Sequence, residues 1–275
     1  MPKMKVGLVG CGNIGADLSN AVFRKTVEAE IVALTDVDPE RAESMRRSFQ
    51  FDAKVCELDE NARLADFIVE CAAPDAVAPV VEAAIRHRRD CLILSVGGLM
   101  EHWHLMEEAR ANGVEIRLPS GALCGLDGIR AGMAAGLNNM PGLHTVVLTT
   151  RKPPKGLEGA PYLIEKNIDL SGLDKPTVVF EGTAREACKA FPKNVNVAAS
   201  LSFAGIGPDE TRVRVIADPT ATVNSHEVFA EGAFGKLRAV TDNLPSPRNP
   251  KSSYLASLSA VAELKAAAGA FQMHQ

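Results

Sequence analysis

The sequence lacks the features that mark several large classes of protein. No apolar run approaches the roughly 20 residues that a membrane-spanning helix needs. There is no basic stripe and the formal net charge is −4, so neither a membrane nor nucleic acid is an expected partner. None of the six cysteines belongs to a Cys-x-x-Cys pair, which gives a zinc site little support, and no bound metal is expected.

The cysteines and the N-terminus also bear on the compartment. Several cysteines lie inside apolar runs, which is typical of buried thiols in a reducing cytoplasm. The strand-like stretch MKVGLVG begins at residue 4, so no signal peptide is expected. With 46% hydrophobic residues, the 275-residue chain can form one large globular domain or two ordinary ones. The sequence therefore predicts a cytoplasmic globular protein.

Short apolar runs alternate with helical patterns through residues 1–120. The runs are VGLVG, IVALTD, AKVC, FIVECA, CLILSV and EIRLP. The helical patterns are NIGADLSNAVFRK, DPERAESMRRSF, DAVAPVVEAAIRHRR and EHWHLMEEARANG. Strands that alternate with helices favour a parallel sheet covered on both faces. We therefore predict a doubly wound α/β domain over residues 1–120.

The pattern changes after residue 120. Strand-like stretches now outnumber helical ones, which is typical of an α+β domain, and we predict such a domain over residues 121–245. A Pro- and Ser-rich connection follows it. Residues 246–275 contain SYLASLSAVAELKAAAGAF, a strong helix by propensity, which we expect to pack back towards the first domain.

One glycine motif points to a cofactor. VGLVGCGNIG contains Gly10-x-Gly12-x-x-Gly15, directly after an apolar strand and at the start of an amphipathic helix. The next strand ends at Asp36, where a dinucleotide fingerprint has its ribose acceptor, and this makes the first domain Rossmann-type. A purely structural glycine turn is the alternative. The expected cofactor-binding residues are Gly10, Gly12, Asn13, Ile14, Gly15 and Asp36.

The cofactor is expected to be NAD. The Asp36 carboxylate favours NAD because it would repel a 2′-phosphate, although nearby Arg41 could help to bind one, which leaves NADP open. Ala72, in the turn CAAP after a later strand, is expected at the cofactor because ligands of such sheets bind at the carboxyl ends of strands. A plain strand–helix turn at Ala72 is an equal alternative.

A histidine in the second domain is a candidate acid or base. Asn224 and His226 share one face of the strand-like stretch TVNSHEVFAEG. Local sequence leaves two interpretations open: a satisfied or solvent-facing histidine, or a catalytic base held on a rigid element. His144 lies at the start of another strand, where a turn or surface role is favoured.

Four segments decide between these interpretations by resemblance. SGALCGLDGIRA, FPKNVNVAAS, NSHEVFAEGAFG and NPKSSYLASLSA, with the N-terminal fingerprint, resemble the L-aspartate dehydrogenase family over nearly the whole chain. The resemblance implies NAD(P)-dependent oxidation of L-aspartate to iminoaspartate, which gives oxaloacetate and ammonia and can feed NAD biosynthesis. It implies that His226 is the active-site histidine, that Ala122 and Asn196 contact the cofactor, and that the second domain also serves a homodimer.

The two carboxylates of such a substrate need polar partners. The positions in the resembling segments indicate these residues: Lys193, Asn194, Ser200, Asn224 and Lys251. A solvated surface side chain is the alternative for each lysine. Two other functions stay open: another two-domain dehydrogenase, acting on homoserine, a sugar or a dihydropyridine dicarboxylate, and a non-catalytic dinucleotide-binding regulator.

Overall fold

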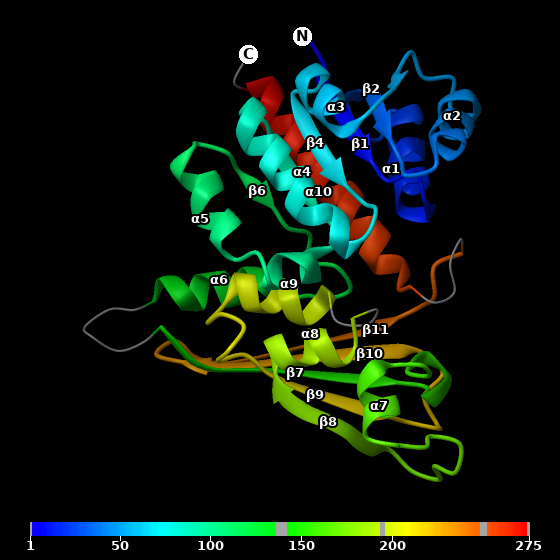
Figure 1. Ribbon diagram of the computed structural model, residues 1–275. Helices are drawn as coiled ribbons and strands as arrows, with labels where there is room; N and C mark the ends of the chain where they lie inside the picture. The colour runs from blue at the N-terminus through cyan, green and yellow to red at the C-terminus, as the bar shows by residue number, and fades with distance from the viewer. Residues whose placement is uncertain (1, 136–141, 193–195, 248–251, 274–275) are drawn as a thin grey trace. The chain divides into compact units, whose positions relative to one another are not determined.

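The computed structural model describes residues 2–135, 142–192, 196–247 and 252–273 (Figure 1). The chain divides into two compact units, which we call the first unit (Met1–Pro119 with Ser257–Gln275) and the second unit (Ser120–Ala256). Within the described ranges, no helix is both long and apolar enough to cross a membrane.

A six-stranded parallel sheet forms the centre of the first unit, in the order β3-β2-β1-β4-β5-β6. The strands are β1 (Met4–Val9), β2 (Ala29–Thr35), β3 (Lys54–Val55), β4 (Phe67–Glu70), β5 (Asp90–Ile93) and β6 (Ile116–Arg117). The strand order reverses between β1 and β4, and ligands of doubly wound sheets bind beyond the carboxyl ends of the strands at such a point. The Rossmann-type fold predicted for this part of the chain is confirmed.

Helices connect the strands of this sheet. They are α1 (Asn13–Phe23), α2 (Pro39–Ser48), α3 (Leu58–Leu64), α4 (Pro74–His87), the 3₁₀ helix η1 (Val96–Met100) and α5 (His104–Ala111). Helix α3 was not predicted, because its seven residues are too few to display a helical stripe. Helix α2 has a side-chain N-cap: Asp38 accepts a hydrogen bond from the Glu40 amide, with Pro39 at the first helical position.

The last helix, α10 (Tyr254–Met273), contributes to the core of the first unit. Its Ala260, Leu264, Ala267 and Ala268 side chains lie in the same buried cluster as Leu8 of β1. Small side chains allow this helix to approach its neighbours closely, which explains why an alanine-rich stretch can form part of a packed core.

A five-stranded mixed sheet, in the order β11-β10-β7-β9-β8, forms the second unit. Its strands are β7 (Leu143–Lys152), β8 (Thr177–Thr183), β9 (Arg212–Ala217), β10 (Asn224–Gly232) and β11 (Gly235–Asn243). Strand β7 runs parallel to β9 and antiparallel to β10. The other elements are α6 (Leu126–Ala134), the 3₁₀ helix η2 (Pro154–Gly156), α7 (Pro161–Glu165), α8 (Ala184–Ala190) and α9 (Asn196–Ala204). The α+β character predicted for this region is confirmed.

One face of this second sheet is buried beneath α6, α8 and α9 (Figure 1). Side chains alternate between the two faces of a strand, so every second residue of β7 and β10 points to this layer. The buried residues of the two strands on this face are Val146, Leu148, Thr150, Lys152, His226, Val228 and Ala230. Three of them are polar or charged, and they occupy the same end of the β7–β10 pair.

Candidate active site

The turn after β1 has the geometry of a phosphate-binding loop. Gly10 has a φ of +102°, and a Cβ there would lie 2.6 Å from the backbone nitrogen of Ala72. A Cβ on Gly15 would lie 2.4 Å from the carbonyl oxygen of Gly10. Gly12 differs, because a Cβ there would meet nothing within 4 Å. Two glycines are therefore required by the packing of the protein itself, whereas Gly12 borders open space.

Helix α1 begins at this loop without a side-chain cap. Gly12 is its N-cap residue, Asn13 and Ile14 form its first turn, and no side chain bonds to the N-terminal amides. Unpaired amides at a helix N-terminus, together with the helix dipole, favour a bound anion. The open space beside Gly12 and these amides fit the pyrophosphate of a dinucleotide.

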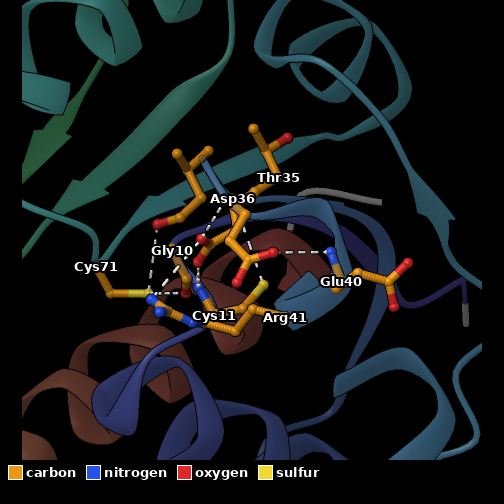
Figure 2. Close-up of polar contacts among 9 residues, drawn as sticks. Gly10, Cys11, Thr35, Asp36, Glu40, Arg41 and Cys71 are labelled. Atoms are coloured by element: carbon orange, nitrogen blue, oxygen red, sulfur yellow. Dashed lines mark hydrogen bonds and ion pairs between the residues drawn. The ribbon is translucent and has the colours of Figure 1, made fainter. Parts of the chain in front are cut away.

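Asp36 follows β2 and is hydrogen-bonded to this loop (Figure 2). Its Oδ2 accepts a 2.7 Å hydrogen bond from the Cys11 amide, and its Oδ1 accepts one of 3.0 Å from the Asp38 amide. The Arg41 guanidinium lies 3.9 Å from Oδ1 and is more than half exposed. The carboxylate is thus held in place before any ribose arrives, with an exposed guanidinium beside it.

A second carboxylate, which the sequence analysis did not single out, connects two later turns. Glu70 ends β4 and is fully buried. It accepts hydrogen bonds from the amides of Ala72, Leu94 and Ser95 and from the Ser95 hydroxyl, at 2.9–3.2 Å. Burial raises its pKa, and these hydrogen bonds oppose that rise. Glu70 thereby fixes the turn of Ala72 at the carboxyl edge of the sheet.

His226 lies on the buried face of the second sheet and is only 3% exposed. A 3.1 Å hydrogen bond joins its Nδ1 to the Thr150 hydroxyl, directly across the β10–β7 pair. If Nδ1–H donates to this hydroxyl, Nε2 carries the lone pair and can accept a proton. Burial, with the charge of Lys152 as the second cause, lowers the pKa of His226 to about 3. The imidazole is therefore neutral near pH 7.

Lys152 and Thr150, the two polar neighbours of His226 on β7, were not predicted. Lys152 is 6% exposed, and burial lowers the pKa of its ammonium group to about 8. Asn224 is half-buried and begins β10. A Cβ on Gly156 would lie 4.0 Å from both the Asn224 Oδ1 and the Lys152 Cδ, so the two side chains approach the same point. The ring of His226 is held by Thr150.

Ala122 and its surroundings form a second polar group in this unit. The carbonyl of the buried Ala122 accepts hydrogen bonds from the Thr241 hydroxyl at 2.8 Å and from the Asn243 Nδ2 at 3.2 Å. The Asn243 Oδ1 is buried without a hydrogen-bond partner in the described structure. Thr241 lies opposite His226 on the neighbouring strand β11, so this group adjoins the histidine.

The remaining predicted residues are distributed as follows. Asn196 is the exposed first residue of α9, and Ser200 is buried one turn further along the same helix. Lys193, Asn194 and Lys251 lie outside the described residues. All six cysteines are free thiols, and the described residues contain no group of three or more side chains suited to a metal. Burial, reinforced by Asp36, raises the pKa of Cys11 to about 12, so this loop thiol stays protonated.

Comparison with known proteins assigns this arrangement to a family. A relative from Methanosarcina acetivorans named L-aspartate dehydrogenase is 46% identical over 270 residues, covering 95% of this chain and 96% of the relative. The chain belongs to the L-aspartate dehydrogenase family. Another member, from Methanococcoides burtonii, is 42% identical over 274 residues, and one from Bradyrhizobium diazoefficiens is 38% identical over 266 residues; each covers at least 96% of this chain and 91% of the relative.

Family models and solved structures agree with this membership. Residues 133–267 match the model described as aspartate dehydrogenase, C-terminal, and residues 10–119 match the NAD binding domain of homoserine dehydrogenase. An aspartate dehydrogenase from Thermotoga maritima superposes with a TM-score of 0.71 at 23% identity, over 97% of both chains. A scyllo-inositol dehydrogenase from Lactobacillus casei with bound NAD(H) gives 0.57 at 14% identity, over 100% of this chain and 90% of that one. These two likenesses show the fold shared by the family member and more distant dehydrogenases.

Proposed function

We propose that this chain is an NAD-dependent L-aspartate dehydrogenase, which oxidises L-aspartate to iminoaspartate and so yields oxaloacetate and ammonia. The observation that carries the proposal is the buried, neutral His226 held by Thr150 near the start of β10. A buried histidine whose pKa is strongly lowered by burial and by a neighbouring buried lysine is a candidate acid–base site. Family membership at up to 46% identity supports the same reaction.

NAD is the cofactor, and the loop of the first unit is suited to hold it. Gly12 and the uncapped α1 amides suit the pyrophosphate, with Gly10, Asn13, Ile14 and Gly15 shaping the loop, and Asp36 suits the ribose hydroxyls. When bound, the cofactor accepts the hydride that leaves the substrate Cα. Arg41, beside Asp36, supports some use of NADP as well. We assign Ala72, Ala122 and Asn196 to the nicotinamide side of the cofactor.

His226 acts as the proton acceptor of the second unit in this proposal. Its Nε2 takes a proton from the substrate amine or from the water that attacks the imine, while Thr150 holds the ring through Nδ1. Ser200 and Asn224 are proposed donors to the substrate, and Lys193, Asn194 and Lys251 stay predictions outside the described residues. Residues 1–120 act as the dinucleotide-binding domain, residues 121–245 as the substrate domain, and residues 246–275 as a helix that packs on the first.

The finer assignments are that the enzyme is a cytoplasmic homodimer and that its iminoaspartate supplies NAD biosynthesis. Six free thiols support a reducing compartment. Support for the homodimer comes from the family resemblance of the second domain, and light scattering of the purified protein tests it. A monomer at micromolar concentration would contradict it.

The test of the reaction is aspartate-dependent formation of NADH by the purified protein. L-Aspartate should be turned over with NAD, and oxaloacetate with ammonia should consume NADH. L-Alanine lacks the second carboxylate, which leaves buried donors unpaired, so it should be a very poor substrate. Homoserine and myo-inositol, run under the same conditions, separate the other dehydrogenase functions. Turnover of alanine at the rate of aspartate would refute the proposal.

A further inference from the structure

Lys152 stands out among the lysines and arginines described in the second unit because it is buried. Most lysines keep their ammonium group in water, and a fully buried one usually has a partner or a function. Lys152 is the last residue of β7, and it pairs in parallel with Ala217 of β9. It lies on the same strand face as Thr150, two residues before it, which bonds to His226.

The residues around Lys152 determine which groups its positive charge can affect. The sheet neighbours on its face are apolar, including Val215 and Ala217, so they do not screen the charge. The carboxylate of Asp218 bonds to Arg151 and to Thr220. Glu227, on β10, pairs with Arg238.

Two other ionisable residues of the second unit bear on Lys152: His226 on the adjacent strand β10, and Lys155 in η2. Lys155 is exposed to solvent. Burial, and second to it the charge of Lys152, lowers the pKa of the His226 imidazole. The Lys152 ammonium group and the His226 imidazole therefore interact electrostatically at the same end of the β7–β10 pair.

We propose that Lys152 is a substrate-binding residue of the His226 site, where its ammonium group binds a carboxylate of a dicarboxylic amino acid. This inference rests on the proposed function and adds to it the group that recognises the substrate charge. A buried ammonium attracts an anion more strongly than a surface one, since water does not weaken the interaction. The Asn224 amide, which adjoins the same point beside Gly156, can donate a second hydrogen bond to that carboxylate.

The proposal also links binding to acid–base chemistry. In the absence of substrate, Lys152 repels a proton from His226. A carboxylate on Lys152 offsets that charge, so the pKa of the imidazole moves up towards the range in which it can accept a proton. Substrate binding thus prepares the base, and a monocarboxylate that leaves Lys152 without its anion does not.

Succinate is the probe of choice, because it has both carboxylates of aspartate but no amine to titrate. Its affinity for the full-length protein with bound NADH is measured by calorimetry from pH 7 to 9.5, for the wild type, Lys152→Met, Lys152→Arg and the exposed neighbour Lys155→Met. The Lys152→Met substitution should weaken succinate binding by roughly 10- to 100-fold, the range for a lost hydrogen bond to a charged group. NADH affinity and the Lys155→Met control should stay at wild-type values.

The pH series gives a readout that a merely structural lysine would not move. The ammonium form binds the anion, so wild-type affinity should hold below about pH 8 and fall by up to about tenfold per pH unit above it. Arginine keeps its charge throughout this range, so Lys152→Arg should bind succinate with no such fall, even if its affinity is lower. This comparison decides the matter if Lys152→Met does not fold.

Two results would overturn the inference: wild-type succinate affinity in Lys152→Met, or the same pH dependence in the wild type and in Lys152→Arg. Aspartate turnover by the wild type is measured separately. Absence of turnover together with a Lys152-dependent succinate affinity would refute the proposed reaction and leave the dicarboxylate site standing. Turnover of aspartate with unchanged succinate binding in Lys152→Met would do the reverse.

Discussion

The two units place their functional groups on different parts of a β-sheet. In the first unit, the polar groups lie in turns beyond the carboxyl ends of strands, and backbone amides of the loop are the proposed binding groups. In the second unit, they lie on the face of the sheet, where Thr150, Lys152 and His226 are side chains of two paired strands. A site made of backbone depends on the conformation of one short segment, whereas a site made of side chains depends on strand register. The two kinds of site should therefore respond differently to substitution.

The largest effect is expected at the side-chain site. The substitution His226→Ala should lower kcat for aspartate by about 10²–10⁴-fold, the usual contribution of general acid–base catalysis. NAD affinity should hardly change, because the residues proposed to hold the cofactor belong mainly to the first unit. Steady-state kinetics, NADH titration and the melting temperature are measured on the same preparation. His144→Ala, at an exposed position of β7, is the matched control and should behave as the wild type. A stable His226→Ala enzyme with wild-type kcat would make His226 an ordinary strand residue.

Substitutions at two glycines of the backbone site, Gly10 and Gly12, should separate an effect on stability from an effect on NAD binding. Gly12 has a φ of −82°, which any residue adopts, and space for a Cβ, so Gly12→Ala should leave the melting temperature unchanged. The methyl group would occupy the proposed phosphate position and weaken NAD binding by roughly 10- to 100-fold. Gly10→Ala should instead lower the free energy of unfolding, by about 1–2 kcal/mol from its positive φ alone, with the contact to Ala72 in addition.

Melting curves and NAD titrations of the two variants are the measurement. Equal losses of stability in both variants would show that the fold requires the space beside Gly12. Gly12 would then no longer differ from Gly10 as a glycine kept for cofactor binding. Unchanged NAD affinity in Gly12→Ala would place the pyrophosphate elsewhere.

A smaller effect is expected at Asp36, the side chain proposed to bind the ribose hydroxyls of the cofactor. Asp36→Ala removes a ribose acceptor and its repulsion of a 2′-phosphate, so the ratio of NADP to NAD affinity should rise by roughly tenfold. Titration of both cofactors measures the ratio. Asp38→Ala, which removes an exposed carboxylate two residues further on, controls for the loss of charge as such. The idea fails if both variants shift the ratio equally.

The same contrast explains what could be predicted from the sequence. The glycine motif and Asp36 lie within 27 residues of one another, and each has a conformational or chemical requirement that a short pattern displays. The alternation of strands and helices likewise revealed both folds. Glu70 was missed because its function is to accept amides from a turn that begins 24 residues later, at Leu94.

Thr150 and Lys152 were missed for a related reason. They approach His226 only through the antiparallel register of β7 with β10, 76 residues apart for Thr150 and His226. The stretch TVVLTTRK displays an ordinary strand alternation, in which a terminal lysine reads as a solvent-facing residue. The preceding apolar positions at 146 and 148 do place Lys152 on the core face, and that two-residue period was the signal available.

The smallest expected effect concerns acid stability, and it arises from the burial of the side-chain site. The pKa of His226 is about 3 in the folded protein against 6.5 for a free histidine. Between these values the unfolded chain binds more protons than the folded one, so stability falls as the pH drops below 6.5. The loss should be about 1 kcal/mol at pH 5.5 relative to pH 7.5. Urea unfolding of the wild type and of His226→Gln at both pH values measures it.

Glutamine does not titrate, so His226→Gln should lose about 1 kcal/mol less than the wild type over this interval, whatever its stability at pH 7.5. Carboxylates that stabilise the fold, such as Asp218, whose pKa is lowered to about 2 by Thr220 and Arg151, contribute equally to both proteins and cancel in the difference. His144→Gln removes an exposed histidine and should reproduce the wild-type loss. If His226→Gln and the wild type lose the same stability, the imidazole is already accessible to protons in the folded state. The side-chain site would then be open to water, as the backbone site beside Gly12 is, and the contrast between the two units would be one of sheet position alone.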